Sequence, residues 1–191
     1  MLASKVAEKR GVRIDWGMAW AAWAWAGIGA CPVWMSTDEI LALAHERLVD
    51  CSDAELPTIL AIADGDGADR VLIQENLRKL FLAEGGSEEI AIRKWRLLLL
   101  QELLDSPKTR SNNHHEVRRA ALDTARKIAD FWGYFPDLGS APLSVQGAGR
   151  TALYYIGYQN NLAEFLEEQQ EWAEREEALL YPRSIPKAGT S

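Results

Sequence analysis

The sequence predicts an all-α protein, a single domain of about seven helices packed as an irregular, orthogonal bundle around a Trp- and Leu-rich core. Apolar residues recur at helical spacing in one segment after another, capping residues precede most of these segments, and no two segments form an evident strand pair. Eight tryptophans and 48% hydrophobic residues in 191 residues are enough for a sizeable core. We assign residues 1–181 to the helical domain and 182–191 to a frayed tail.

The first expected helix follows Asp15, a suitable N-cap, and ends at Gly27. Its tryptophans Trp16, Trp20 and Trp23 have the spacing of one helical face. This spacing favours a helix that packs an aromatic stripe into the core of a cytoplasmic protein.

The same region raises one alternative, because residues 16–37 contain no charged side chain and are long enough to cross a bilayer. The run Ile28-Gly-Ala-Cys31 looks like a lipoprotein cleavage box, so the alternative is an N-terminal anchor at Cys31. Composition favours the buried helix instead, since the stretch is built from Ala, Gly and Trp and contains Pro32. With Cys51 as the only other cysteine, no disulfide framework is expected.

Two further helices are expected to begin with capping boxes. Ser36 precedes Glu39 by three residues, and Ser52 precedes Glu55 by the same spacing. The second of these helices should be short, because the run from Asp64 to Gly67 predicts a turn.

The central helices have clear starts and stops. Asp69 favours the start of a helix whose apolar stripe ends at Gly85-Gly86. Ser87 then precedes the strongest helix in the chain, which carries Trp95. Four consecutive leucines, 97–100, predict that this helix is buried on more than one side.

The C-terminal half opens with a polar stretch at 105–113, a loop or subdomain joint. Asn113 with Glu116 begins a helix that contains Trp132, residues 134–150 read as irregular, and residues 151–158 are ambiguous between helix and strand. Asn161 with Glu164 is expected to cap the last helix.

Charge and motifs exclude several functions. A net charge of −7 argues against nucleic-acid binding, which requires a surplus of Lys and Arg. The chain has no phosphate loop, no dinucleotide-binding glycine pattern and no nucleophile elbow, so no catalytic residue, metal or cofactor is predicted. The alternative is a metal-dependent hydrolase that uses His114, His115, Asp64 and Asp66, although neighbouring histidines on a helix point about 100° apart.

The last helix carries the main functional prediction. One of its faces is acidic, and the members of this acidic stripe are Glu164, Glu167, Glu168, Glu171 and Glu174. Leu162, Phe165, Leu166, Trp172 and Ala173 form the opposite, apolar face. Like charges at i, i+4 destabilise a helix. The stripe is therefore interpreted either as a solubilising surface or as a docking surface for a basic protein partner.

A locally basic region precedes the acidic stripe in sequence. Its members are Lys108, Arg110, Arg118, Arg119, Arg126 and Lys127. These residues are equally suited to pair with acidic side chains of the same chain, so we assign them no nucleic-acid partner.

Three motifs resemble the uncharacterised bacterial family "domain of unknown function 2247" (DUF2247). They are the opening tryptophans followed by Ser36-Thr-Asp-Glu39, the central Lys94-Trp95-x-x-Leu-Leu helix, and Asp130-Phe131 followed by the run from Tyr134 to Pro136. The resemblance covers about residues 12–172. It implies a bacterial protein with no established catalytic residues. By analogy with small, acidic, helical immunity proteins, it suggests a module that binds and neutralises a basic, toxin-like protein.

Overall fold

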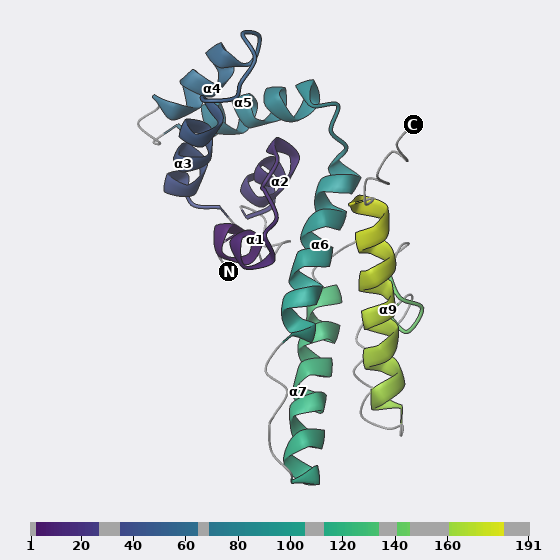
Figure 1. The fold of residues 1–191 in the computed structure, drawn as a ribbon. Coiled ribbons are helices and arrows are strands. Elements are labelled where there is room, and N and C mark those ends of the chain that lie inside the picture. Colours follow the sequence, from purple (N-terminus) through teal and green to yellow (C-terminus); the bar gives the residue numbers. More distant parts are fainter. Residues whose placement is uncertain are drawn as a thin grey trace, which may run out of the picture. The chain divides into compact units, whose positions relative to one another are not determined.

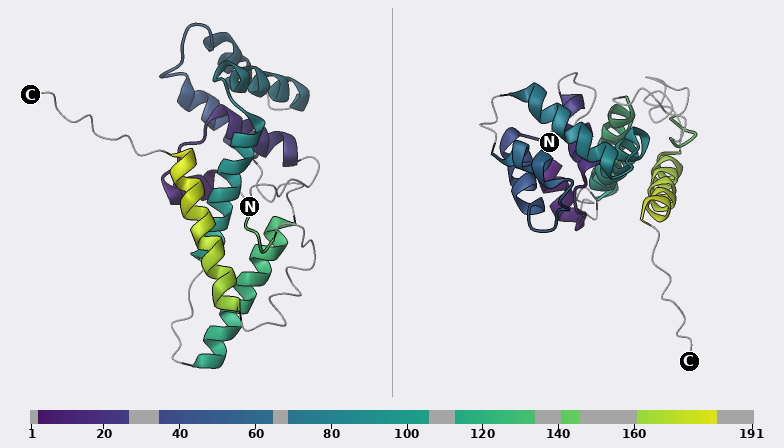
Figure 2. Two further views of the ribbon diagram at one scale, coloured as in Figure 1. Left: turned by 90° about the vertical axis from the view of Figure 1, so that its right-hand side faces the viewer. Right: turned by 90° about the horizontal axis from the view of Figure 1, so that it is seen from above.

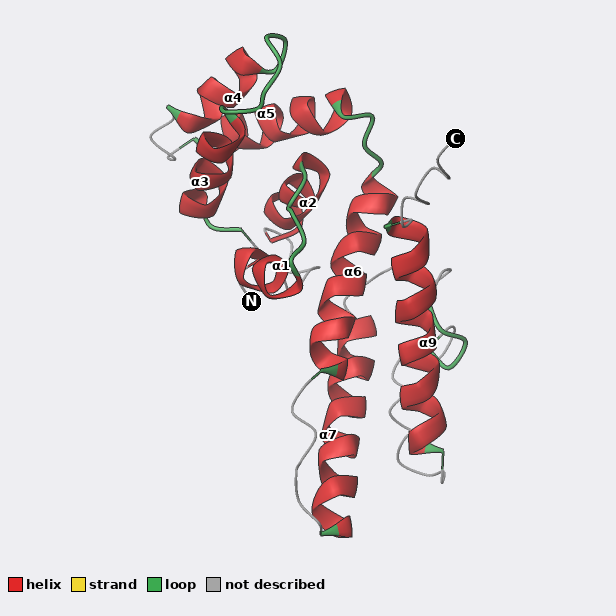
Figure 3. Cartoon of the chain, viewed as in Figure 1, coloured by secondary structure: helices red, strands yellow, loops and turns green. Residues whose placement is uncertain are grey.

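The chain is all-α in a computed structural model that describes residues 3–26, 35–64, 69–105, 113–133, 141–145 and 161–181. These residues form eight helices and no strand (Figure 3). The predicted fold class is confirmed.

The described residues group into two compact units, and the boundary falls between Leu99 and Leu100. Unit 1 holds the described residues up to Leu99, and unit 2 holds those from Leu100 onward. The joint expected at 105–113 lies mostly outside the described residues, and the assignment of 1–181 to one domain stays a prediction.

Unit 1 contains the first five helices and most of the sixth (Figure 1). Their bounds are α1 Ala3–Arg10, α2 Trp16–Ala26, α3 Thr37–Arg47, α4 Leu56–Ala63, α5 Arg70–Ala83 and α6 Glu88–Leu104. Unit 2 contains the end of α6 together with α7, His114–Trp132, and α9, Leu162–Leu180. Helices α7 and α9 contact each other. Figure 2 shows the two helices, α7 in green and α9 in yellow, from two further directions.

The tryptophan stripe of α2 lies in the core of unit 1. Trp16 and Trp23 are buried, and the ring of Trp20 stacks on Phe81 of α5 with centroids 5.3 Å apart. The prediction that this helix packs its aromatic stripe into a core is confirmed. Gly17 allows the close approach, because a Cβ at that position would lie 3.0 Å from the Phe81 ring.

Four predicted helix starts are confirmed by hydrogen bonds. Ser36 and Glu39 form a complete capping box on α3. The Asp15 carboxylate accepts the Met18 N–H at 2.7 Å. Asp69 accepts two N–H groups at the start of α5, and Asn113 accepts the His115 N–H at the start of α7. These side chains satisfy N–H groups that have no partner within their helices.

Two predicted caps differ from the structure. Ser52 donates its hydroxyl to Glu55 at 2.6 Å, but the pair closes a separate turn, and α4 begins after it at Leu56. Asn161 occupies the N-cap position of α9 without a side-chain cap hydrogen bond. Its ψ of 24° departs from the extended backbone that directs an N-cap side chain toward the first turn.

Helix α1 was not anticipated from the sequence. Its eight residues have a mixed composition, and only Ala3, Val6 and Ala7 are buried. The predicted stop of α5 at Gly85-Gly86 is confirmed, because Gly85 has a φ of 69° and Gly86 donates to the Phe81 carbonyl. This is the arrangement in which glycine most often ends a helix.

A buried tryptophan anchors each unit. In unit 1, Trp95 of α6 donates its indole N–H to the Met18 carbonyl at 2.8 Å. In unit 2, Trp132 of α7 donates to the side chain of Gln169 at 2.8 Å and lies edge-on to Trp172. Leucines 97–100 are all buried, as predicted for a helix covered on more than one side.

Several predictions lie outside the described residues. They concern Gly27, Cys31, Asp66, the basic residues Lys108 and Arg110, the irregular segment 134–150 apart from 141–145, the ambiguous segment 151–158, and the tail 182–191.

Candidate functional site

The acidic stripe of α9 lies on the exposed side of that helix. Glu164, Glu167, Glu171 and Glu174 are exposed, and Glu168 is half-buried. The buried side consists of Phe165, Gln169, Trp172, Ala173 and Glu176. The predicted division into an acidic and a packed face is therefore present, although the packed face includes two polar residues.

Most of the stripe has no partner within the part of the chain that the structure describes. The side chains of Glu164, Glu167 and Glu171 make no hydrogen bond or ion pair there. Glu168 accepts the Ser144 N–H at 3.2 Å, and Glu174 accepts the Gln170 side-chain amide at 3.0 Å. Both donors are neutral, so the negative charge of the stripe is not compensated by them.

Helix α9 carries almost the whole net charge of the protein. It contains seven glutamates and one arginine, whereas the rest of the chain has 21 acidic and 20 basic residues. Neighbours at i, i+3 and i, i+4 on a helix are about 5–6 Å apart, so the acidic side chains repel one another. Packing of the opposite face offsets this cost.

Hydrogen bonds between polar side chains fix that opposite face of α9. Gln169 is fully buried, accepts the indole N–H of Trp132 and donates to the Ser144 hydroxyl at 3.3 Å. The ring centroids of Trp132 and Trp172 lie 5.0 Å apart. A buried amide with satisfied hydrogen bonds sets the rotation of a helix more sharply than apolar packing does. The carboxylates are thus held on the exposed side.

The basic residues of α7 do not neutralise the stripe. Arg118, Arg119 and Lys127 are exposed and form no ion pair within the described residues. Arg126 lies 3.9 Å from Asp123 of its own helix. Of these four residues, Arg126 alone forms the internal pairing that the sequence left open within the described residues, and its partner lies on α7 rather than in the stripe.

The residues of the metal-hydrolase alternative are not gathered into a described site. His114 and His115 are exposed in the first turn of α7, Asp64 follows α4, and Asp66 lies outside the described residues. Across the described ranges, no group of three or more His, Cys, Asp or Glu side chains is placed to hold a metal ion.

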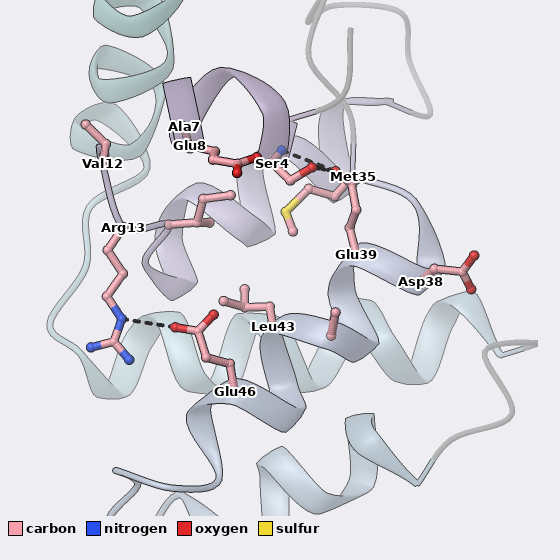
Figure 4. Close-up of a pocket in the computed structure, with 12 residues that line it drawn as sticks. Ser4, Ala7, Glu8, Val12, Arg13, Met35, Asp38, Glu39, Leu43 and Glu46 are labelled. Atoms are coloured by element: carbon pink, nitrogen blue, oxygen red, sulfur yellow. Dashed lines mark hydrogen bonds and ion pairs between the residues drawn. The ribbon is translucent and has the colours of Figure 1, made fainter. Parts of the chain in front are cut away.

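Unit 1 contains a cavity of about 550 Å³ between α1 and α3, which we call the α1–α3 cavity (Figure 4). Ala7, Val12, Met35 and Leu43 form much of its apolar wall. Its charged lining consists of Glu8, Asp38, Glu39, Glu46 and Arg13. The size falls within the range of small-molecule sites.

A second cavity, of about 420 Å³, lies near the start of α2 and is lined by Asp15, Glu84 and Lys94. Lys94 pairs with Asp15, and Glu84 accepts the Trp16 N–H at 3.1 Å. Burial raises the pKa of the Glu84 carboxyl, and the neighbouring Asp15 carboxylate adds to the rise. These side chains hold the start of α2 against α5 and α6, which accounts for their positions.

The sequence did not indicate either cavity. The walls of the α1–α3 cavity come from α1, a helix that the sequence did not reveal, and from a segment more than 20 residues later. Gln169 was also missed, because a glutamine next to an acidic stripe gives no sign that a tryptophan 37 residues earlier donates to it. Only the capping box at Ser36 and Glu39 marked part of the cavity wall in advance.

Among the described residues, no helix is long and apolar enough to cross a membrane. No family model, curated protein or solved structure matches the chain. The resemblance to DUF2247 therefore stays a prediction.

Proposed function

We propose that this chain is a non-catalytic protein-binding module that presents the acidic stripe of α9 to a basic protein, in the manner of an immunity protein. The observation that carries the proposal is the concentration of charge. One helix holds nearly all the net charge, and three of its exposed carboxylates have no partner within the described residues. A solubilising surface does not require that concentration.

A basic partner fits this surface in two ways. Carboxylates spaced along 10 residues of one helix give a line of negative charge about 15 Å long. Complementary charge accelerates association and discriminates against acidic partners, and both effects weaken as salt screens the interaction. The packed face of α9 is already occupied, so the partner contacts the carboxylates rather than Trp172.

The test compares two variants with the same net charge. In the first, Glu167, Glu171 and Glu174 are changed to Lys. In the second, the exposed acids Asp53, Glu75 and Asp130 are changed to Lys outside the stripe. Tagged wild type is used to capture proteins from the native host at low and high salt, and the captured protein is then purified and titrated against all three chains.

We expect the stripe variant to fold normally and to lose partner binding, while the control variant retains most of it. Binding by the wild type should also weaken as salt is raised. Equal binding by both variants at low salt would show that the stripe is only a solubilising surface.

A further inference from the structure

The α1–α3 cavity carries more negative charge than its own residues neutralise. The described part of its lining holds four carboxylates and one guanidinium. Arg13 lies 3.6 Å from Glu46 and 3.8 Å from Asp50, which is outside the lining, so its single charge is divided between two acids. Among the described residues, no other basic side chain lines the cavity.

Glu39 is held in place and ionised by neutral donors. It accepts the Ser4 N–H at 3.2 Å, the Ser4 hydroxyl, and the Ser36 N–H at 2.8 Å. Burial acts to raise the pKa of Glu39, but these hydrogen bonds outweigh it and hold the pKa below its ordinary value. Neutral donors satisfy the oxygens without cancelling the charge.

Glu8 supplies a second carboxylate at the same end of the cavity. It lies one helical turn after Ser4, and its side chain has no hydrogen bond or ion pair within the described residues. Figure 4 shows its carboxylate directed toward Ser4, whereas Asp38 extends away from the other labelled side chains. Glu8 and Glu39 therefore form the acidic end of the cavity.

The wall next to this acidic end is apolar. Ala7, Met35 and Leu43 are buried residues that line the cavity. The carboxylates do not converge as metal ligands, since no metal-holding group of three is present in the described ranges. An inorganic cation would contact only the carboxylates, whereas an organic cation contacts both the carboxylates and the apolar wall.

We propose that the α1–α3 cavity binds a small organic cation, an ammonium group carried on an unbranched alkyl chain. The ammonium lies between Glu8 and Glu39, and the chain lies along Met35 and Leu43. This inference does not depend on the function proposed for α9, because every lining residue belongs to unit 1.

Three probes of matched length test the charge requirement: hexylamine, 1-hexanol and hexanoate. Each is titrated into the full chain while backbone amide shifts are followed by NMR. Hexylamine should bind saturably, with the shifts centred on Ser4, Met35 and Leu43. It should bind about tenfold more tightly than hexanol, as expected for one ammonium between two carboxylates, and hexanoate should not bind.

Two substitutions test the location, each with a matched control. Ala42 is an exposed residue of α3 that lines the cavity, so Ala42→Phe should fill it and abolish binding. Ala61→Phe makes the same change at an exposed position of α4, outside the lining, and should have no effect on binding. Glu8→Gln should weaken hexylamine binding by roughly threefold, whereas the exposed control Glu75→Gln should not.

The proposal is overturned if hexylamine does not bind, if hexanol binds as tightly as hexylamine, or if the shifts map elsewhere. Unchanged binding by Ala42→Phe also overturns it, provided that its amide spectrum shows a folded chain. Loss of binding in Ala61→Phe as well as in Ala42→Phe would place the probe outside this cavity and reject the assignment.

Discussion

The two units bury a tryptophan in the same way but satisfy its indole N–H differently. In unit 1, Trp95 donates to a backbone carbonyl, that of Met18. In unit 2, Trp132 donates to the side chain of Gln169, which itself bonds to Ser144. A backbone acceptor is present whatever residue occupies its position, whereas a side-chain acceptor depends on one residue type. The stability of unit 2 therefore depends more strongly than that of unit 1 on which residue provides the acceptor of the indole N–H.

The largest expected effect is the loss of either tryptophan. Trp95→Ala and Trp132→Ala should each lower the free energy of unfolding by about 3–5 kcal/mol, because both rings are at most 2% exposed and leave large cavities. Denaturant titration followed by circular dichroism measures the change. Leu82→Ala, at a site 58% exposed, serves as the control and should cost little. A small loss for Trp95→Ala would mean that α6 is not anchored through this ring.

The second effect isolates the polar contact in unit 2. Gln169→Leu should lower the free energy of unfolding by about 1–3 kcal/mol, since it leaves the indole N–H of Trp132 buried without an acceptor. Trp132→Phe in the same chain removes the unsatisfied donor.

The two changes form a double-mutant cycle measured by denaturant titration. The combined variant should lose less stability than the two single losses added together, because removing both partners of a buried hydrogen bond costs less than removing one. Strict additivity would contradict the proposed coupling between Trp132 and Gln169.

The third effect, smaller than the first two, is a pH dependence of stability that has opposite directions for two carboxylates of unit 1. The pKa of Glu39 is lowered from 4.5 in the folded chain, so its stabilisation is complete above pH 4.5 and is lost as pH falls through the folded pKa. The pKa of Glu84 is raised from 4.5, so its contribution is present below pH 4.5 and is lost as pH rises through the folded pKa.

Unfolding free energies measured across this pH range separate the two groups. Glu39→Gln should flatten the loss of stability below pH 4.5. Glu84→Gln should flatten the loss above pH 4.5, and it retains an amide oxygen that can accept the Trp16 N–H. The assignment of opposite shifts is wrong if both variants flatten the same limb of the curve.

The smallest effect concerns the acidic stripe itself. Glu167→Gln removes like-charge repulsion with Glu164 and Glu171 and should raise the free energy of unfolding by about 0.2–0.5 kcal/mol, more at low salt. Glu75→Gln on α5 should act in the opposite direction, because Arg78 and Lys79 lie three and four residues after it. Chemical denaturation at two salt concentrations measures both changes. A loss of stability in Glu167→Gln would indicate that this carboxylate is paired.

Local chemistry explains which features of the fold were predictable. The capping box at Ser36 and Glu39 and the Asp69 and Asn113 caps involve residues two or three positions apart, so their spacing in sequence already fixes their geometry. The glycine stop at Gly85 is local in the same sense. Asn161 makes no side-chain cap bond, and its ψ of 24° departs from the extended backbone of an N-cap, which spacing in the sequence does not encode.

The sequence by itself determined the all-α class, most helix starts, a core rich in Trp and Leu, and the two-sided character of α9. Each of these follows from periodicity and from contacts within one or two helical turns. Only the tertiary structure placed Gln169 under Trp132, brought α1 against α3 to form a cavity, and set Glu8 and Glu39 at one end of it. Those pairings join helices more than 25 positions apart in sequence, and their geometry depends on how helices pack rather than on any local pattern.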